Sequence, residues 1–252
     1  MISAVVITLN EAANIAACLK PLLQVCEDIV VVDAFSTDGT KAIAESLGAR
    51  VIQSEWMGYA QNKNLGNQAA RHDWILSIDA DEVLSDDLIQ TLQQLVPQPQ
   101  TVYELDRLTN YCGKWIHHSG WYPDWKVRLF DRREVRWQGE FVHETLAVPA
   151  GYKIIRVRGK LLHYSYKTRE DHLLRVDRYA ALSARELYAK GKRATWVKLW
   201  LSPLFRFLRT FLINRAFLDG KEGLAISMSG ARLVRRKYSL LREMELGRVP
   251  LL

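Results

Sequence analysis

Cysteine is scarce in this sequence, and its three cysteines, Cys18, Cys26 and Cys112, form no CxxC pair. That spacing argues against a disulfide framework and a zinc site, and it favours a reducing compartment. Proline and glycine are also few, at 7 and 14 of 252 residues, while 48% of the residues are hydrophobic. This composition excludes a disordered or fibrous chain and fits one large domain, or one domain with a small extension.

The sequence also lacks a basic segment before its first apolar run, residues 2–9, which leads directly into Asn10 and Glu11. This arrangement predicts a first β-strand rather than a signal peptide. The apolar window of residues 196–213 has 12 apolar residues of 18, but three cations and Pro203 interrupt it. These interruptions argue against a membrane-spanning helix.

The net charge of +7 is unevenly distributed along the chain. Residues 1–100 contain 5 Lys and Arg against 13 Asp and Glu, a difference of −8, whereas residues 101–252 contain 30 against 15, a difference of +15. Carboxylates can hold a metal ion, and basic residues can meet phosphates or an anionic surface. The two parts are therefore expected to have different partners, unless both simply carry solvated charges.

Short apolar runs alternate with helical patterns over the first hundred residues. Strands are predicted at residues 2–9, 29–33, 50–53 and 74–79, and helices at 12–25, 38–47, 59–71 and 85–96. The last helix begins after Ser85, an expected N-cap. The alternation predicts an α/β fold, a mostly parallel sheet with helices on both faces. After a linker at residues 97–100, strand-like runs continue to about 166, and the chain is helical from about 168.

Polar side chains gather where the predicted strands end. They are Thr8, Glu11, Asp33 and Asp79. Because ligands bind beyond the carboxyl ends of parallel strands, these side chains are expected to converge on one site. Asp79-Ala80-Asp81 is the sharpest motif, since two carboxylates one residue apart can face one Mg²⁺ or Mn²⁺ ion and leave positions for a diphosphate. A helix-capping aspartate in a strand–helix loop is the alternative. Asp38 and Thr40 are expected to serve a turn and a cap.

Three segments in this order and spacing resemble family 2 glycosyltransferases with the GT-A fold. They are Thr8-Leu9-Asn10-Glu11, Val32-Asp33 with Ser36-Thr37-Asp38-Gly39-Thr40, and Ile78-Asp79-Ala80-Asp81-Glu82. Further segments resemble the bacterial branch of lipopolysaccharide-core β-glucosyltransferases. They are Gly113-Lys114-Trp115-Ile116, Gly120-Trp121-Tyr122-Pro123-Asp124, Arg128-Leu129-Phe130, Val142-His143-Glu144 and Phe217-Leu218-Asp219-Gly220. The resemblance covers nearly the whole chain.

The resemblance implies a GT-A enzyme in three segments: a nucleotide-sugar-binding half at residues 1–100, an acceptor-binding half at 101–167 and a basic amphipathic helical extension at 168–252. It implies an inverting, metal-dependent transfer of a hexose, with UDP-glucose as the expected donor. The acceptor would be a saccharide of an anionic, lipid-linked glycan such as the lipopolysaccharide inner core. The enzyme would act in the cytoplasm, peripherally on the inner face of the cytoplasmic membrane.

By the same resemblance, the nucleoside would lie among Thr8, Glu11 and Asp33. Many members carry a second acid, credited with reading uracil, at the position of Ala34. Uridine is still the expected nucleoside, but this sequence lacks that acid. Lys63 occupies a place where members often carry a basic residue near the donor. A solvated helix lysine is the alternative interpretation of Lys63.

The resemblance also implies a divalent metal, Mg²⁺ or Mn²⁺. Asp81 would be its main ligand, and Asp79 would face the donor sugar or ribose and could join the metal. His163 closes an apolar strand-like run, where a histidine is usually a satisfied core residue. Members of this fold often recruit a distant histidine as an added metal ligand, so both interpretations of His163 remain.

An inverting transfer needs a base that takes the proton of the acceptor hydroxyl. Glu144, in the pair His143-Glu144, resembles the acid pair of relatives and is the expected base, with Asp124 as the second candidate. A salt bridge within the arginine-rich stretch is the alternative role for Glu144. The aromatic stretch from Tyr111 to Trp125 would contact sugar faces or form a minor core. The cations Arg128, Arg132 and Arg133 could bind phosphates of an anionic glycolipid.

The window of residues 196–213 has polar side chains that step by helical intervals. They are Lys198, Ser202, Arg206 and Arg209, beside Trp196, Trp200, Leu204, Phe207 and Phe211. Residues 190–252 carry 14 Lys and Arg against 4 Asp and Glu, which favours contact with anionic lipid. The pattern predicts a helix in the plane of a membrane surface, or one packed on the protein itself.

Three other activities are alternatives to this interpretation. Transfer to a polyprenyl phosphate would need no base, because that acceptor is already anionic. A sugar-phosphate nucleotidyltransferase would need a glycine-rich basic loop after the first strand, whereas residues 10–14 contain neither glycine nor a basic residue. A nucleic-acid-binding module fits poorly with the interleaved acids and the Asp79-Ala80-Asp81 motif, so no nucleic-acid partner is expected.

Overall fold

The computed structural model describes residues 1–139 and 144–248. The chain forms two compact units, unit 1 from Met1–Arg107 and Asp124–His163, and unit 2 from Leu108–Pro123 and the chain from Tyr164 onward. The segments expected at residues 1–100, 101–167 and 168–252 do not coincide with this division. The reason is that strands β6 (Thr101–Tyr111) and β11 (Lys153–Tyr166) each begin in unit 1 and end in unit 2.

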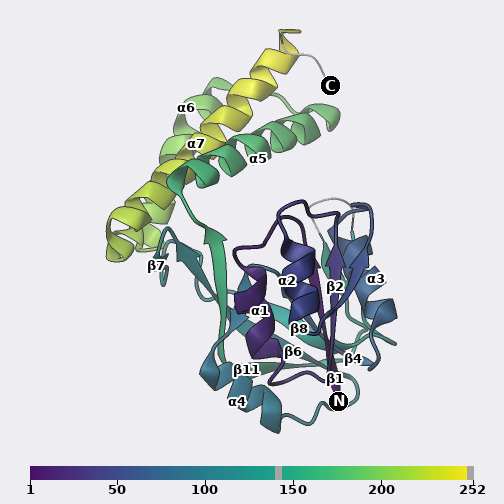
Figure 1. The fold of residues 1–252 in the computed structure, drawn as a ribbon. Coiled ribbons are helices and arrows are strands. Elements are labelled where there is room, and N and C mark those ends of the chain that lie inside the picture. The colour runs from purple at the N-terminus through teal and green to yellow at the C-terminus, as the bar shows by residue number, and fades with distance from the viewer. Residues whose placement is uncertain (140–143, 249–252) are drawn as a thin grey trace. The chain divides into compact units, whose positions relative to one another are not determined.

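The main sheet has nine strands among the described residues, in the order β3-β2-β1-β4-β8-β6-β11-β5, with β7 paired to β6 (Figure 1). The other bounds are β1 Ile2–Thr8, β2 Asp28–Asp33, β3 Arg50–Gln53, β4 Trp74–Asp79, β5 Glu82–Leu84, β7 Lys114–Trp115 and β8 Trp125–Asp131. Strands β1 to β4 pair in parallel, as the sequence predicts. Strand β8 joins them antiparallel to both β4 and β6, so the complete sheet is mixed.

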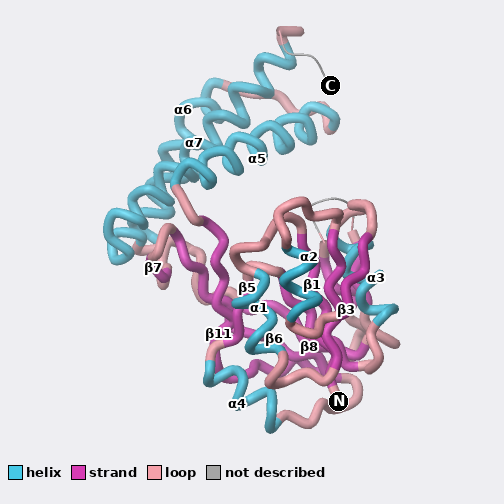
Figure 2. The backbone as a smooth tube through the Cα atoms, viewed as in Figure 1, coloured by secondary structure: helices cyan, strands magenta, loops and turns pink. Residues whose placement is uncertain are grey.

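Helices cover both faces of the sheet, as predicted (Figure 2). Helices α1 (Ile15–Leu22), α2 (Thr40–Ser46) and α4 (Asp86–Gln94) pack on one face, whereas α3 (Tyr59–Ala69) packs on the other with β9 (Arg136–Gln138). A hydrophobic core lies on each face of the sheet, and the side chains of β1 alternate between the two cores. Ala4 and Val6 pack in one core, and Val5 and Ile7 pack in the other. Ser85 caps α4 as predicted, since its Oγ accepts the Leu88 N–H at 3.4 Å.

Helix α3 approaches the sheet closely through Gly66. A Cβ at this position would lie 2.4 Å from Val5 Cγ1 and 3.0 Å from Val32 Cγ2, so only glycine fits without a shift. The close approach brings the first turns of α3 against the carboxyl ends of β1 and β2. Lys63, one turn before Gly66, is thereby buried over the sheet rather than solvated.

Unit 2 is helical after Thr168, as predicted. Its elements are α5 (Arg169–Ala189), α6 (Trp196–Leu208), the π-helical turn η1 (Arg209–Ile213), the 3₁₀ turn η2 (Ala216–Asp219) and α7 (Gly220–Glu245). Helix α7 packs against both α5 and α6. Asp219 binds the loop that contains His117 and His118, because its carboxylate accepts hydrogen bonds from the N–H groups of both residues, each at 3.1 Å. Among the described helices, none has the length and apolar character required to span a bilayer.

Candidate active site

The carboxyl ends of β1, β2 and β4 meet at one edge of the sheet. Their register pairs Thr8 with Asp33 and Ile7 with Asp79. Asp81 follows two residues after β4, and Lys63 reaches the same edge from α3. The polar residues at the ends of these strands are therefore brought together, as their positions in the sequence predict.

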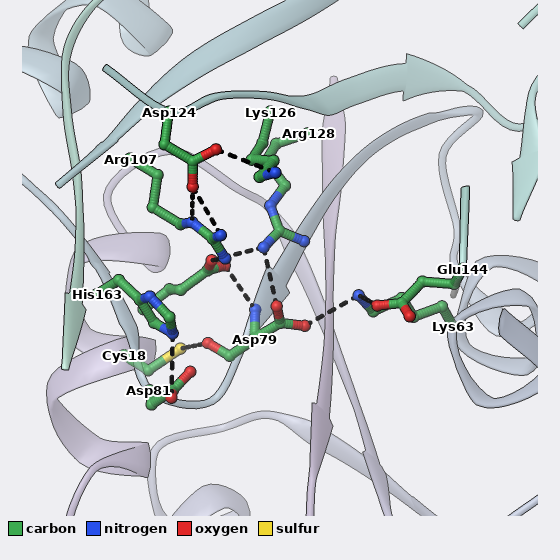
Figure 3. Close-up of polar contacts among 11 residues, drawn as sticks. Cys18, Lys63, Asp79, Asp81, Arg107, Asp124, Lys126, Arg128, Glu144 and His163 are labelled. Carbon is green, nitrogen blue, oxygen red and sulfur yellow. Dashed lines mark hydrogen bonds and ion pairs between the residues drawn. The ribbon is translucent and has the colours of Figure 1, made fainter. Parts of the chain in front are cut away.

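Asp79 lies at the centre of a buried charge cluster (Figure 3). Its Oδ1 is 3.1 Å from Lys63 Nζ, and its Oδ2 accepts a hydrogen bond from Arg128 Nη2 at 2.8 Å. The side chains of Lys63 and Arg128 are only 3% and 4% exposed, so water screens neither ion pair strongly. Each carboxylate oxygen of Asp79 thus lies beside a cation, and a role of Asp79 as a metal ligand stays a prediction.

Glu82 completes the acidic part of this cluster. Its Oε1 accepts from Arg128 Nη2 at 2.5 Å, and its Oε2 accepts the Asp79 N–H at 3.0 Å. Arg107 links Glu82 to Asp124, because Nη1 lies 3.4 Å from Glu82 Oε1 and Nη2 lies 2.7 Å from Asp124 Oδ2. The buried network therefore extends from Lys63 through Arg128 and Arg107 to Asp124.

The charges of the network shift the pKa values of its acids. Burial alone would raise the pKa of the Asp79 carboxyl, but the positive charges of Arg128 and Lys63 outweigh burial and hold it well below its ordinary value. Asp124 follows the same pattern, with Arg107 and Lys126 lowering its pKa against the effect of burial. Both carboxylates are consequently ionised at neutral pH and held by cations.

Lys63 also connects the cluster to Glu144. Its Nζ lies 3.5 Å from Glu144 Oε1 and 4.4 Å from the centre of the Trp137 ring. Glu144 and Asp79 thus lie beside the same ammonium group of Lys63. The predicted base for the acceptor hydroxyl therefore lies next to the predicted donor site. His143, which precedes it in the motif, lies outside the described residues.

Asp81 and His163 form the pair of side chains best suited to a metal ion. Asp81 Oδ2 lies 3.3 Å from His163 Nε2, and both side chains are partly exposed, at 20% and 15%. Within residues 1–139 and 144–248, no group of three or more His, Cys, Asp or Glu side chains is arranged to hold a metal. A carboxylate and an imidazole are nevertheless donors that Mn²⁺ accepts, and two protein ligands leave positions for water and a diphosphate. The residues present therefore fit a divalent ion with few protein ligands.

The loops after β1 and β2 are held together by hydrogen bonds. Asp33 Oδ2 accepts the Ser36 N–H at 3.1 Å, and Thr40 Oγ1 accepts the Glu11 N–H at 2.8 Å. Asp38 accepts from the backbone of Ala12 and of Thr40, which confirms its predicted turn role. These contacts place Asp33 and Glu11 at the edge of the sheet.

Thr8, at the end of β1, has a side-chain oxygen that lies buried. Among the described residues, Thr8 Oγ1 has no hydrogen-bond partner. A buried hydroxyl without a partner is uncommon and points to a missing ligand or water. This orphaned group supports the prediction that a polar ligand binds beside Thr8.

Three arginines that the sequence suggests for an anionic glycolipid have other partners. Arg128 is buried against Asp79 and Glu82, Arg132 donates to the carbonyls of Asn67 and Ala70, and Arg133 pairs with Asp131. Glu82 and Arg107, in contrast, carry the network without having been predicted to do so. No local pattern marks them, because their partners lie on strands distant in the sequence.

Comparison with known proteins identifies the family. The profile of the family described as Glycosyl transferase family 2 matches residues 3–153. An uncharacterised glycosyltransferase of Rickettsia felis is 31% identical over 261 residues, covering 96% of this chain and 91% of the relative. The lipopolysaccharide core biosynthesis glycosyltransferase LpsC of Rhizobium meliloti is 30% identical over 238 residues, covering 91% and 87%.

Solved structures show a weaker likeness. Glucosyl-3-phosphoglycerate synthase from Mycobacterium tuberculosis is 21% identical and has a TM-score of 0.35, with 44% of each chain covered. The family match extends over more than half of the chain, and both relatives are similar over nearly all of it. This chain therefore belongs to glycosyltransferase family 2, with the mixed sheet and flanking helices of the GT-A fold.

Proposed function

We propose that this glycosyltransferase moves a hexose from a UDP-sugar, with UDP-glucose as the expected donor, to a saccharide of a lipid-linked glycan. The observation that carries the proposal is the Asp81–His163 pair beside the buried cluster of Lys63, Asp79 and Arg128. The similarity of this chain to LpsC, a protein named for lipopolysaccharide core biosynthesis, supports a core saccharide as the acceptor. The nucleotide-sugar half, the acceptor half and the helical extension follow one another along the chain, at residues 1–100, 101–167 and 168–252.

Donor binding would use the edge formed by β1, β2 and β4. Thr8, Glu11 and Asp33 would surround the nucleoside, and Asp81 with His163 would hold Mg²⁺ or Mn²⁺. When bound, the divalent ion supplies positive charge that stabilises the departing diphosphate. Asp79 would orient the donor sugar or ribose, and Lys63 with Arg128 would keep its carboxylate ionised and fixed.

Glu144 would act as the base of an inverting displacement. The acceptor hydroxyl oxygen attacks the anomeric carbon, the bond from that carbon to the diphosphate oxygen breaks, and the hydroxyl proton passes to Glu144. A carboxylate suits this role because the hydroxyl becomes acidic only as the new bond forms. Lys63, 3.5 Å from Glu144, would hold the carboxylate toward the donor side of the site.

The helical part of unit 2 would contact an anionic membrane surface. Large apolar side chains on α6 are exposed, including Leu201 at 58%, Leu204 at 54% and Phe205 at 62%. An exposed apolar face of this kind marks an interaction site, and the excess of cations in residues 190–252 matches anionic lipid. Of the predicted face, Trp196, Trp200 and Leu204 are also exposed, whereas Phe207 and Phe211 stack on one another and are only half exposed.

The proposed donor and metal can be tested together. We would measure nucleotide release and product formation with a panel of UDP- and GDP-sugars plus Mn²⁺ or Mg²⁺, and UDP binding by calorimetry with and without Mn²⁺. Asp81→Ala should abolish the metal-dependent part of UDP binding, and His163→Ala should weaken it, while neither variant changes the melting temperature much. Asp87→Ala, an exposed acid in the first turn of α4, is the matched control.

Two outcomes would contradict the proposal. Unchanged metal-dependent UDP affinity in Asp81→Ala would exclude this residue as the metal ligand. Turnover of GDP-sugars alone would exclude uridine as the base that the site reads.

A further inference from the structure

A cavity of about 180 Å³ lies within unit 2 and contains none of the residues assigned above to the donor, the metal or the base. A space for one water molecule needs only about 10–15 Å³ by the same measure, so this cavity admits a larger polar group. It is bounded by helix α5, by α6 with η1, by α7 and by the loop of Ser119 and Trp121. The element labels in Figure 1 locate these helices.

The wall of the cavity is cationic. Arg175 of α5 and Arg206 of α6 both line it, and the lining residues include no Asp or Glu. In the part of the chain that the structure describes, neither arginine forms an ion pair with a carboxylate. Gly230 of α7 makes room for Arg206, since a Cβ there would lie 3.2 Å from Arg206 Nε. Two guanidinium groups without an acidic partner leave a positive charge that an anion would neutralise.

Thr210 adds an independent sign of a ligand. It lies in the π-helical turn η1, lines the cavity and is 3% exposed. Within the described residues, its Oγ1 has no hydrogen-bond partner. Burying a hydroxyl without a partner is unfavourable, and π-helical turns are frequent at functional sites. An oxygen atom of a bound ligand would satisfy this hydroxyl.

Aromatic groups complete the wall. Trp121, Tyr166 and His172 line the cavity, and the Arg175 guanidinium lies 5.1 Å from the centre of the Tyr166 ring. Burial, together with the charge of Arg175, lowers the pKa of His172 to about 4, so its imidazole is neutral at pH 7. Aromatic faces suit the C–H faces of a sugar, whereas the arginines suit a phosphate.

We propose that this cavity binds a phosphate group carried by a sugar. Arg175 and Arg206 would bind the phosphate oxygens, Thr210 would donate its hydroxyl hydrogen to one of them, and the sugar would lie against the aromatic side chains. If the proposed function is correct, on which this step rests, the cavity holds a phosphorylated sugar of the acceptor glycan. A lipid headgroup offers the same phosphate chemistry, and the experiment separates the two sources.

Calorimetry on the full chain tests the cavity directly, with glucose 6-phosphate, glucose and phosphatidylglycerol vesicles as probes. The wild type should bind glucose 6-phosphate more tightly than glucose. Arg175→Gln and Arg206→Gln should each weaken that binding about tenfold or more, because charge-assisted hydrogen bonds are lost. Thr210→Val keeps the shape and should weaken it about threefold or more at an unchanged melting temperature. Arg178→Gln, exposed on the same helix and outside the cavity, is the control.

Several results would overturn the proposal. One is an equal affinity of the wild type for glucose and glucose 6-phosphate, and another is that Arg178→Gln weakens glucose 6-phosphate binding as much as Arg175→Gln does. The third is that the variants lose affinity for the vesicles but not for glucose 6-phosphate, which would assign the phosphate to a lipid headgroup. UDP binding with Mn²⁺ is measured in the same variants and should stay unchanged. A wild type that binds glucose 6-phosphate through the cavity but does not bind UDP would contradict the proposed function and leave the phosphate site standing.

Discussion

Arg107 donates two hydrogen bonds to one carboxylate oxygen of Asp124, from Nε at 2.9 Å and from Nη2 at 2.7 Å. The other oxygen of Asp124 lies 3.0 Å from Lys126 Nζ. Both oxygens therefore have cationic partners, and the pKa of Asp124 is lowered. A carboxylate held in this way is a weak proton acceptor, which favours Glu144 over Asp124 as the base.

Replacing Glu144 by glutamine should lower turnover by roughly 10²-fold or more, because the amide keeps the shape but cannot take a proton. Donor affinity should stay unchanged, since Glu144 is assigned to the acceptor side of the site. Steady-state kinetics with UDP calorimetry measures both quantities. Asp124→Asn is the comparison and should act mainly on thermal stability. An inactive Asp124→Asn beside an active Glu144→Gln would move the assignment to Asp124.

The buried cluster predicts a large loss of stability when Arg128 is replaced by methionine. The change leaves Asp79 and Glu82 buried with too little positive charge, and breaking a buried ion pair on one side costs about 3–5 kcal/mol. Chemical denaturation measures the free energy of unfolding. Arg133→Met, whose side chain is 63% exposed, should change it little. An equal effect of the two substitutions would mean that the cluster does not stabilise unit 1.

The lowered pKa of Asp79 gives the stability of the cluster a defined pH dependence. Because the folded pKa is depressed, the stabilisation is fully present above the ordinary pKa of about 3.9 and is lost as the pH falls through the folded value. The difference in melting temperature between the wild type and Asp79→Asn, which lacks the titrating carboxyl, should therefore be constant from pH 7 to about pH 4. It should narrow only in more acidic solution, and a difference that narrows already between pH 7 and pH 5 would contradict the assignment.

Gly66→Ala should destabilise the protein although alanine favours helices. The new Cβ would lie 2.4 Å from Val5 Cγ1, and such overpacking costs about 1–3 kcal/mol, against a gain of about 1 kcal/mol from helix propensity. The shift of α3 should also move Lys63 and lower turnover. Thermal unfolding and kinetics test both effects. Gln68→Ala, on the exposed side of the same helix, should be neutral, and a stabilised Gly66→Ala would refute the close packing.

The exposed face of α6 predicts binding to anionic vesicles. Phe205→Asp should reduce binding roughly tenfold or more, because a large apolar side chain contributes about 1.5–3 kcal/mol when buried. Binding should weaken at high salt, since surface charges are screened. Phe207→Asp should instead lower the melting temperature, because Phe207 stacks on Phe211 with ring centres 5.4 Å apart. If the wild type does not bind anionic vesicles at low salt, the proposed contact with the membrane is wrong.

Much of unit 1 could be predicted from local sequence. The apolar runs at residues 29–33 and 74–79 became β2 and β4 almost residue for residue, because a strand buried on both faces leaves a continuous apolar signal. Ser85 was predictable as the N-cap of α4, because a serine side chain at this position can accept a backbone N–H of the first turn, as it does in the structure. The convergence of Asp33 and Asp79 followed from the geometry of parallel strands alone.

Long-range pairing could not be predicted in the same way. Strand β8 lies between β4 and β6, and this position brings Arg128 against Asp79 and Glu82. No periodicity at residue 128 indicates which strand it pairs with, so the sequence alone favours an anionic ligand for its guanidinium group rather than partners in the core. For a related reason the sequence could not predict that Phe207 and Phe211 are half-buried while the rest of the predicted face of α6 stays exposed, because packing against α7 and η2 decides the difference.

The double use of strand β1 limits how this chain can evolve. Because its even-numbered and odd-numbered residues fill different cores, inserting or deleting one residue within Ile2–Thr8 would exchange the two sets of side chains and remove Thr8 from its place beside Asp33. Substitutions that conserve volume leave that alternation intact. Length changes should therefore accumulate in the loops between elements, while β1 keeps its length even where its residues differ between relatives.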